Sequence, residues 1–422
     1  MSNQMHADVV IVGAGMVGLT LAAAMAPSGM KIIVLEQRKG DPQGFSDWVR
    51  AQQSENFDPR VSALTCASQQ ILTAVGAWEK MASFRLSPYT DMDVWDGEGT
   101  GKIHFSAQDL HEQALGHIVE NRVTLAGLLA TVAELDNVQL VTGVELVKAD
   151  LSASSLKTLE LSDQRCIETS LLVAADGALS KTRQMAGLPM LEWDYGHHAI
   201  VTTVKTSVDH QQTAWQRFTD DGPLALLPLS SDDGNHYCSI VWSTSPGHAK
   251  ALMTLSDEDF CQALGAAFEH VLGDILETDQ RSVFPLRQRH AQHYVKSGFV
   301  VIGDAAHTIH PLAGQGVNLG LLDAAQLAET LMAAYARGEA LGSLSVLRRY
   351  QRERHSENIQ MAATMEGFKR LFASRNPVAV LARNMGMNWL DGLGAIKNHL
   401  VQEAMGLSGK GPALAQRSFK DS

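Results

Sequence analysis

Residues 7–37 constrain the fold most strongly, because they read as a strand, a tight turn, a helix and a second strand. "DVVIV" is a short apolar run of mostly β-branched residues, and "KIIVLE" is a second such run. Between them, "MVGLTLAAAMA" has the pattern of a buried helix. A strand, helix and strand within about 30 residues form a βαβ unit with parallel strands. The sequence therefore predicts an α/β fold.

The turn inside this unit carries the pattern G-x-G-x-x-G. Gly13 allows the tight turn, Gly15 lets a pyrophosphate approach the backbone, and Gly18 lets helix and strand pack closely. Val17 lies inside the motif, and Glu36 ends the second strand, where it can accept hydrogen bonds from ribose hydroxyls. A carboxylate there favours FAD or NAD over NADP. The alternative is a glycine-rich turn without a ligand.

Two further strand ends carry an aspartate. "LLVAADGALSKTR" places Asp176 and Gly177 after a buried strand, and "FVVIGDAAH" places Gly303 and Asp304 after another. An aspartate at the carboxyl end of a buried strand can reach a sugar hydroxyl of a bound dinucleotide. Each motif alone is weak, because Asp-Gly is common in turns. The three together, in this order, are specific.

With these three motifs, the chain resembles the FAD-dependent aromatic hydroxylases related to para-hydroxybenzoate hydroxylase, over nearly its whole length. The resemblance implies an α/β fold with a Rossmann-like FAD-binding domain of the glutathione-reductase type, an inserted mainly-β substrate domain and a helical C-terminal region. Residues 40–59 are polar and contain Gly, Pro, Ser and Asn, so they are expected to form an extended loop, and "DMDVWDGEGTGKIHF" is expected to form a hairpin. The pattern of strands and helices sets the boundaries. The FAD-binding domain is expected at 1–85, 100–185 and 290–340, the substrate domain at 190–290 and the helical region at 341–422.

The resemblance also assigns roles to the stretch "HTIHPLAGQGVNLG". Asp304 would bind a ribityl hydroxyl of FAD, and the loop with Pro311, Gly314 and Gly316 would pass beside the flavin ring as the catalytic segment. The helix that follows would point its positive end at the flavin and stabilise the reduced, anionic ring. Arg60 and Arg122 would contact the flavin; single arginines are more often surface ion pairs. The expected cofactor contacts are Gly13, Gly15, Val17, Gly18, Glu36, Arg60, Arg122, Asp176, Asp304, Gly316, Val317 and Asn318.

The implied reaction is a monooxygenation. NAD(P)H, as co-substrate, reduces FAD, O2 adds to the flavin, and the C4a-hydroperoxide transfers a hydroxyl group to an electron-rich phenol ring. One complete G-x-G-x-x-G agrees with a nicotinamide that binds only transiently. The protein must orient the ring and exclude water. An apolar wall is expected from Trp215, Phe218, Leu226 and Pro228, although an ordinary hydrophobic core explains them equally well.

Within this family, "GDAAHTIHPLAGQGVNLG" and "HIVENRV" look like the ubiquinone-biosynthesis hydroxylases, and "WDYGHHAIVTTVKT" looks like the 2-polyprenylphenol hydroxylases among them. The substrate would then be a phenol that carries a long isoprenoid tail. A hydroxylase of a soluble aromatic compound and a non-catalytic flavin-binding member of a biosynthetic complex are the alternatives. A halogenase is disfavoured, because its W-x-W-x-I-P string is absent.

Charge and composition limit the classes of partner that the chain is expected to bind. The formal net charge of -12 argues against nucleic acid. Residues 341–422 nevertheless contain 12 Lys and Arg against 6 Asp and Glu, a net of +6, so that the first 340 residues carry -18. This basic C-terminal region suggests peripheral contact with a membrane surface, or with other ubiquinone-biosynthesis proteins.

The remaining signals predict a cytoplasmic protein that can lie peripherally at the inner membrane. Cys66, Cys166, Cys238 and Cys261 show no C-x-x-C spacing, and no cluster has metal-ligand spacing, so no metal is expected. No basic residue precedes the first apolar run, and no stretch of about 18 apolar residues could span a membrane. The ring position hydroxylated, the tail length, the choice of NADH or NADPH, the oligomeric state and the roles of His307 and His310 stay open.

Overall fold

The computed structural model describes residues 4–52, 56–153, 156–308, 316–373, 376–407 and 411–416. Its first sheet has the strand order β18-β19-β11-β1-β2-β8, with β1, β2, β8, β11 and β19 parallel where they pair and a β9–β10 hairpin added beside β11. The strands are β1 (Gln4–Val12), β2 (Ile32–Glu36), β8 (Val138–Thr142), β9 (Leu146–Asp150), β10 (Lys157–Leu161), β11 (Cys166–Ala174), β18 (Val295–Lys296) and β19 (Phe299–Val301).

The parallel register brings three motif-bearing strand ends together. Val12 pairs with Leu35 on one side and Ala174 on the other, and Ala174 pairs with Val301. The carboxyl ends of parallel strands form one edge of a sheet, where ligands of α/β folds bind. The turns after β1, β11 and β19 and the end of β2 therefore lie at one edge.

Helices pack on this sheet and bury its apolar side chains. The helix α1 (Met16–Met25) packs against α9 (Gly316–Ala336) and α5 (Asn121–Val132). Val10, Ile11 and Leu321 are fully buried between these layers. The other helices near this sheet are α2 (Pro42–Arg50), α3 (Cys66–Ala74), α4 (Trp78–Ala82), α6 (Lys181–Met185) and α10 (Leu344–Ala373). This arrangement confirms the predicted α/β class.

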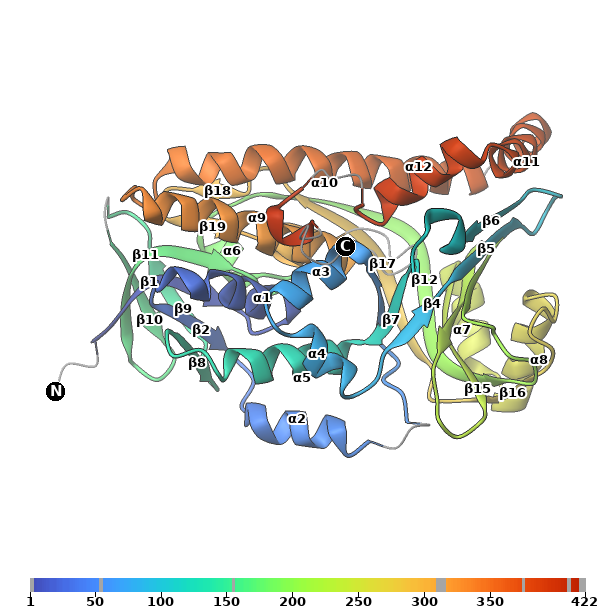
Figure 1. Cartoon of the computed structure of the whole chain (residues 1–422), viewed down its shortest axis with the longest axis horizontal. Helices are drawn as coiled ribbons and strands as arrows, with labels where there is room; N and C mark the ends of the chain where they lie inside the picture. Colours follow the sequence, from blue (N-terminus) through green and yellow to red (C-terminus); the bar gives the residue numbers. More distant parts are fainter. Residues whose placement is uncertain are drawn as a thin grey trace.

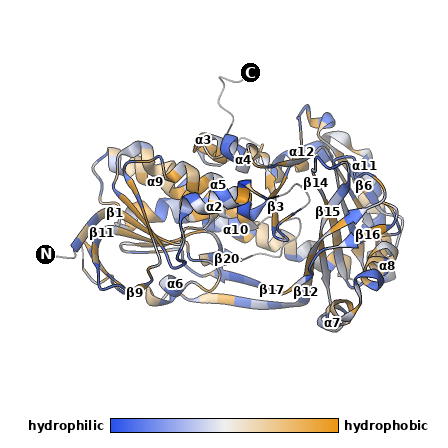
Figure 2. Cartoon of the chain, turned by 90° about the horizontal axis from the view of Figure 1, so that it is seen from below, coloured by the Kyte–Doolittle hydropathy of each residue, from blue (hydrophilic) through white to orange (hydrophobic). Residues whose placement is uncertain are grey.

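A second sheet of nine strands lies at the other end of the molecule (Figure 1). Its order is β20-β17-β12-β15-β14-β13-β5-β6, with β16 beside β12, and α7 (Pro246–Thr254) and α8 (Asp257–Ala267) cover one face. Figure 2 shows that the long strands β12 and β17 join the two ends. The strands are β5 (Asp91–Asp96), β6 (Lys102–Ser106), β12 (Met190–Thr206), β13 (Thr213–Thr219), β14 (Gly222–Leu229), β15 (His236–Thr244), β16 (Ile275–Thr278), β17 (Ser282–Ala291) and β20 (His307–Thr308).

Two smaller parts complete the fold. A three-stranded sheet, β3 (Val61–Thr65), β7 (Gly116–Glu120) and β4 (Ser87–Tyr89), lies between the larger sheets (Figure 1). After α10, the chain forms α11 (Pro377–Gly392) and α12 (Gly394–Ala404), which continue along the same side of the molecule (Figure 1). None of the helices in the described part of the chain is long and apolar enough to cross a membrane.

Two segments differ from the sequence-based expectation. Residues 40–59 were expected to be an extended loop, but Pro42–Arg50 is helical because Asp41 caps its first turn through the amides of Gln43 and Gly44. The expected boundaries also assign 100–106 to the FAD-binding domain. In the structure, β6 stays with its hairpin partner β5 and extends the nine-stranded sheet.

Candidate cofactor and active site

The turn between β1 and α1 admits only glycine at two positions. Gly13 has a φ of 109°, and a Cβ there would lie 2.4 Å from the carbonyl oxygen of Ala175. A Cβ on Gly18 would lie 2.1 Å from the carbonyl oxygen of Gly13. Both distances are far below any real Cβ contact, so the glycines let β1, α1 and the end of β11 pack directly on one another.

Gly15, between them, faces open space. It is the N-cap of α1 in an extended conformation, no side chain caps the helix there, and nothing described lies within 4 Å of its ideal Cβ position. The first amides of a helix have no partner within the helix, and the positive end of the helix dipole coincides with them. Uncapped amides beside open space suit the pyrophosphate of a dinucleotide.

Glu36 is held against this turn. Its Oε2 accepts a hydrogen bond from the amide of Ala14 at 3.0 Å, and its Oε1 accepts one from the amide of Arg38 at 2.9 Å. A carboxylate has about four acceptor positions, so the remaining lone pairs can receive hydroxyl groups. The position and chemistry of Glu36 suit the ribose of the same dinucleotide.

Asp176 lies at the same edge but its carboxylate is already engaged. It accepts hydrogen bonds from the amide and the hydroxyl of Thr182 at 3.1 and 2.9 Å, and from the hydroxyl of Ser180. These contacts fix the first turn of α6. In this structure the carboxylate of Asp176 therefore caps α6, and its Cα lies 3.0 Å from the position that a Cβ on Gly13 would take.

Gly303 and Asp304 begin a short 3-10 turn after β19. Gly303 has a φ of 57°, and a Cβ there would lie 3.2 Å from both methyl groups of Val17. A Cβ on Gly320 of α9 would lie 2.6 Å from the same side chain. Val17 therefore packs between α1, the Gly-Asp turn and α9, and brings the three into contact.

The carboxylate of Asp304 has an unusual environment. The residue is exposed to solvent, yet the surrounding protein raises its pKa through desolvation, against the opposing charges of His307 and Arg289. Asp304 is thus accessible to a ligand that enters this edge of the sheet.

The start of α9 is tied to β3. Gly316 is its first residue and Val317 is half-buried. Asn318 is 3% exposed; its Oδ1 accepts hydrogen bonds from the hydroxyl of Ser68 at 2.7 Å and the amide of Thr65 at 3.2 Å. Its Nδ2 donates to the carbonyl of Ala63 at 2.8 Å. The side chain of Asn318 therefore positions the helix start. Pro311, Gly314 and His310 lie outside the described residues.

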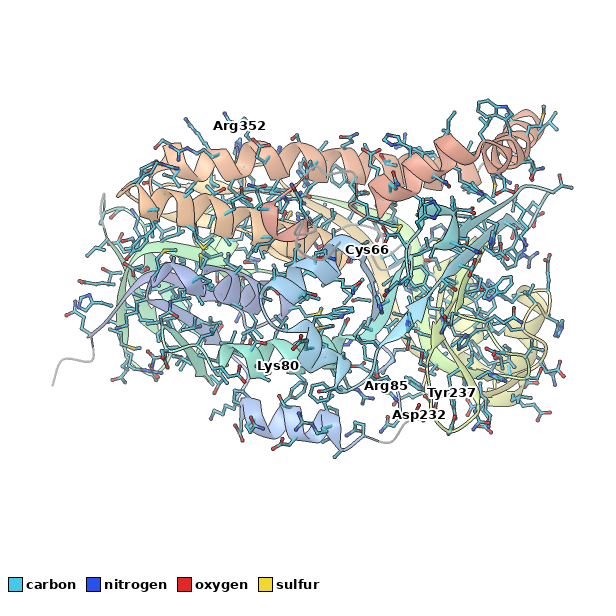
Figure 3. All side chains as sticks on the ribbon, in the orientation of Figure 1. Cys66, Lys80, Arg85, Asp232, Tyr237 and Arg352 are labelled. Carbon is cyan, nitrogen blue, oxygen red and sulfur yellow. The ribbon has the colours of Figure 1, made fainter. Side chains whose placement is uncertain are left out.

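The two arginines that were expected at the flavin are neighbours through the backbone, since the amide of Asn121 donates to the carbonyl of Arg60. Arg122 is 8% exposed and forms an ion pair of 2.7 Å with Glu120. Its Nε is buried and has no partner among the described residues. The side chain of Arg60 is exposed. Arg85, which no sequence motif indicated, donates to the same Glu120 through Nε at 2.9 Å (Figure 3).

A buried polar network supports the Gly-Asp turn from behind. His307 Nε2 lies 2.5 Å from Asp323 Oδ2, and that oxygen also accepts the amide of Gly303 at 3.1 Å. Asp323 Oδ1 accepts Arg354 Nε at 2.8 Å and Asn358 Nδ2 at 3.1 Å. Burial opposes ionisation of Asp323, but His307 and Arg354 outweigh it and hold its pKa well below the usual range.

The four side chains that were expected to form an apolar wall around the substrate lie on both faces of the nine-stranded sheet. Trp215 pairs with Leu226, and both pack in the core beneath α7 and α8. Pro228 shares that face by alternation. Phe218 points to the opposite face and stacks on Phe372, with ring centroids 3.8 Å apart. The structure therefore brings Trp215, Leu226 and Pro228 together, but on the face of the sheet that α7 and α8 cover.

The opposite face of the same strands forms an apolar cluster with the three-stranded sheet. Ala225, Leu227 and Leu229 alternate with the residues of the α7–α8 core and are at most 7% exposed. They contact Ala63 of β3 and Ile118 of β7 within one cluster. Because the carbonyl of Ala63 receives Asn318, this cluster adjoins the start of α9. Alternation could have identified this set, but not which face of the sheet adjoins the start of α9.

Comparison with known proteins gives an independent result. Residues 6–364 match the family model described as FAD binding domain. The chain is 35% identical over 407 residues to the 3-demethoxyubiquinol 3-hydroxylase of Escherichia coli (strain K12), covering 96% of this chain and 100% of that protein. It is 32% identical over 442 residues to the mitochondrial ubiquinone biosynthesis monooxygenase COQ6 of Homo sapiens, covering 93% and 91%.

Solved structures share the fold. The p-nitrophenol 4-monooxygenase PnpA of Pseudomonas putida DLL-E4 superposes with a TM-score of 0.75 at 20% identity, covering 97% of this chain and 100% of that one. PqsL of Pseudomonas aeruginosa, described as a probable FAD-dependent monooxygenase, superposes with a TM-score of 0.73 at 19% identity, covering 90% and 99%. At this level of identity the likeness concerns the fold alone.

Proposed function

Because the chain belongs to the FAD binding domain family and, within it, to the FAD-dependent hydroxylases of ubiquinone biosynthesis, we propose that it hydroxylates the aromatic ring of a polyprenylated phenol. This membership confirms the predicted family and the prediction that the chain is a flavin monooxygenase. The observation that carries the cofactor assignment is the open, uncapped start of α1 beside Glu36. NAD(P)H as the electron donor is our finer proposal.

The residues present fit FAD. The amides at the start of α1 would bind the pyrophosphate, Glu36 the adenosine ribose, and Asp304 a hydroxyl of the ribityl chain. The positive end of α9, a helix that starts at Gly316, would stabilise negative charge on the ring. Bound FAD, once reduced, supplies the activation of O2 that an aromatic hydroxylation needs.

The protein must position the aromatic ring of the substrate and exclude water from the reacting groups. We propose that the apolar cluster of Ala225, Leu227 and Leu229, with Ala63 and Ile118, forms the dry wall beside the start of α9. Phe218 lies on this face of the sheet, whereas Trp215, Leu226 and Pro228 support it from behind. An apolar enclosure suits a prenylated phenol and protects the reaction from water.

Asp323 would act as a positioning residue. Its carboxylate accepts the amide of Gly303, the residue before Asp304, and contacts the imidazole of His307, three residues after Asp304. The ion pair with Arg354 fixes this carboxylate between α9 and α10. The arrangement holds the Gly-Asp turn in one conformation and so presents Asp304 to the cofactor.

The electron donor and the cellular location of the enzyme are two further parts of the proposal. The sequence holds one complete G-x-G-x-x-G, so we propose that NAD(P)H binds transiently beside the bound FAD. A prenylated substrate partitions into membranes, so we propose a cytoplasmic enzyme with peripheral contact at the inner membrane, in the company of other ubiquinone-biosynthesis proteins.

An experiment on FAD and substrate together tests the proposal. The purified protein is loaded with FAD, and its anaerobic reduction by NADH and by NADPH is followed with and without a prenylated phenol. Faster reduction with the phenol, followed by a hydroxylated product after O2 is admitted, is the expected result. A rate of FAD reduction that the prenylated phenol leaves unchanged but a soluble aromatic acid increases would favour a hydroxylase of soluble compounds instead.

A further inference from the structure

The last two helices form an arm that is fixed to the β5–β6 hairpin by buried polar contacts. We use "C-terminal arm" for residues 376–407, which contain α11 and α12. Arg383 Nε donates to Asp96 Oδ2 at 2.7 Å, with both side chains at most 2% exposed. Asn384 Nδ2 donates to the same oxygen at 2.9 Å. Such contacts set which face of α11 turns inward.

Every charged residue between positions 381 and 402 serves this attachment. These residues are Arg383, Asp391 and Lys397. Asp391 Oδ1 accepts the amide of His104 at 3.1 Å, and Lys397 Nζ donates to the carbonyl of His104 at 2.9 Å. Lys397 and Asp391 also pair with each other at 3.2 Å. In a chain with 19% charged residues, this surface stretch therefore offers solvent no uncompensated charge.

The outward side of α11 is apolar instead. Leu381, Met385 and Trp389 follow at intervals of four, so they lie along one side of the helix. Their exposed fractions are 61%, 63% and 66%. In α12, Ile396 and Leu400 are four residues apart and 50% and 47% exposed. We call these five residues the apolar stripe. An exposed stripe on a helix whose other side is fixed indicates a docking surface.

We propose that the apolar stripe docks on the surface of an anionic lipid bilayer. The inference rests on the proposed function, because a phenol with an isoprenoid tail resides in lipid. A tryptophan among aliphatic side chains is typical of helices that lie in the membrane interface. The basic C-terminal region, with its net charge of +6, would orient this end toward anionic headgroups.

The neighbouring surface supports this orientation. In α10, which leads into the arm, Arg352 is 74% exposed, points outward (Figure 3) and lies 3.7 Å from Glu353. Arg370, near the end of α10, is 79% exposed and pairs with Glu366 at 2.7 Å. Figure 1 shows α10, α12 and α11 in succession along one side of the molecule, so basic side chains and the stripe belong to the same run of helices.

The arm also adjoins the candidate active site. Met405 packs with Cys66 and Leu110 in one apolar cluster, and its carbonyl accepts the amide of Ala67 at 3.1 Å. The amide of Thr65, two residues earlier, donates to Asn318 at the start of α9. Only the first turn of α3 therefore separates the arm from the helix that faces the flavin. Docking here would bring the lipid surface to the catalytic side of the molecule.

Flotation with vesicles tests the proposal. The FAD-loaded full chain is mixed with vesicles of phosphatidylcholine and phosphatidylglycerol, and the bound fraction is compared with that of the triple variant Leu381→Gln, Met385→Gln, Trp389→Gln. We expect the partition coefficient to fall by at least about tenfold, since three side chains lose interfacial burial. The control carries Val147→Gln, Trp193→Gln and Leu276→Gln, at positions 57%, 50% and 52% exposed elsewhere on the surface, and should bind like the wild type.

Four outcomes decide the matter. Equal binding of the triple variant and the wild type overturns the proposal, as does a wild type that binds no vesicles. Loss of self-association or of a protein partner in the triple variant, without any vesicle binding, also overturns it. Fluorescence quenching by brominated phosphatidylcholine that disappears in Trp389→Phe supports it, because it places this residue in the lipid.

Failure of docking and failure of the proposed function are separable. A short-chain prenylated phenol that is soluble in water should be hydroxylated equally by wild type and triple variant. If neither protein hydroxylates it, the proposed function fails, whereas the vesicle measurement still decides docking. If both do, and only the long-tailed phenol in vesicles is turned over more slowly by the variant, both proposals stand.

Discussion

His307 and Asp323 meet in the interior, with 2.5 Å between Nε2 and Oδ2 and exposed fractions of 1% and 0%. The same carboxylate accepts the amide of Gly303 and pairs with Arg354 of α10. One ionised side chain thus connects two helices to the strand end that carries Asp304. The shape of the proposed cofactor site therefore depends on a charge that lies behind it.

Removing this charge should destabilise the protein strongly. In Asp323→Asn, Arg354 would stay buried with only the half-exposed Glu357 as counter-ion, and the loss of a buried partner costs on the order of 3–5 kcal/mol. Urea unfolding of the FAD-free protein measures the change. Glu339→Gln is the matched control, because it removes a carboxylate from the exposed pairs with Arg337 and Arg349, where little change is expected. Equal effects of the two substitutions would contradict this account.

A substitution at Gly15 should affect cofactor binding without affecting folding. Its φ of -78° suits alanine, and no described atom would meet a Cβ there. Gly15→Ala should therefore keep the unfolding midpoint but lower the affinity for FAD by at least about tenfold, because the methyl group occupies the pyrophosphate position. Gly247→Ala, also open around its Cβ, is the control. Unchanged FAD affinity in Gly15→Ala would remove the dinucleotide from this turn.

His117 should make the fold sensitive to acid. It lies in β7 with its ring 4.9 Å from that of Trp78, and burial lowers its pKa from 6.5 to about 4. Between these values the unfolded chain binds a proton that the folded chain does not, so stability falls as the pH drops from 6.5 to 4 and the loss is complete below 4. We expect roughly 3 kcal/mol from this group, because each pH unit between 6.5 and 4 contributes about 1.4 kcal/mol.

The measurement for His117 is the free energy of unfolding as a function of pH. His117→Gln should lose less stability than the wild type on going from pH 7 to pH 4, whereas His399→Gln, at an exposed position of α12, controls for the loss of an imidazole. Parallel curves for the wild type and His117→Gln would show that the acid sensitivity has another origin.

Asp96 should control the C-terminal arm without touching the cofactor. Asp96→Asn removes the charge that holds Arg383 and weakens its bonds to Asn384, so hydrogen exchange across 376–407 should speed up. The affinity for FAD should stay the same. Asp257→Asn, which breaks the solvent-accessible pair with Arg281, serves as the control. Unaltered exchange in the arm would mean that its attachment depends on the apolar contacts of Met387 and Leu390.

Local patterns predicted much of this structure, since they concern residues close in sequence. The unit of β1, α1 and β2 follows from its glycines and its two apolar runs, and β5 and β6 follow from the turn between them. Even α2 had a signal, an aspartate followed by proline at 41 and 42, which loop-like composition obscured.

Contacts between distant residues had no comparable signal. Asp323 and Arg354 are 31 positions apart on different helices, and neither lies in a recognisable motif. Alternation along β14 implies that Leu226 and Leu227 face opposite sides, but α7 and α8 decide which side is covered. The attachment of the C-terminal arm depends on Asp96 and Arg383, which are 287 residues apart.

The fate of oxygen tests the central claim most directly. The FAD-loaded protein would be supplied with NAD(P)H, a prenylated phenol and ¹⁸O2, and the products measured by mass spectrometry. The account predicts a hydroxylated phenol that carries one atom of ¹⁸O and is formed in proportion to the NAD(P)H consumed. Consumption of NAD(P)H that yields only hydrogen peroxide, with the phenol recovered unchanged, would contradict it.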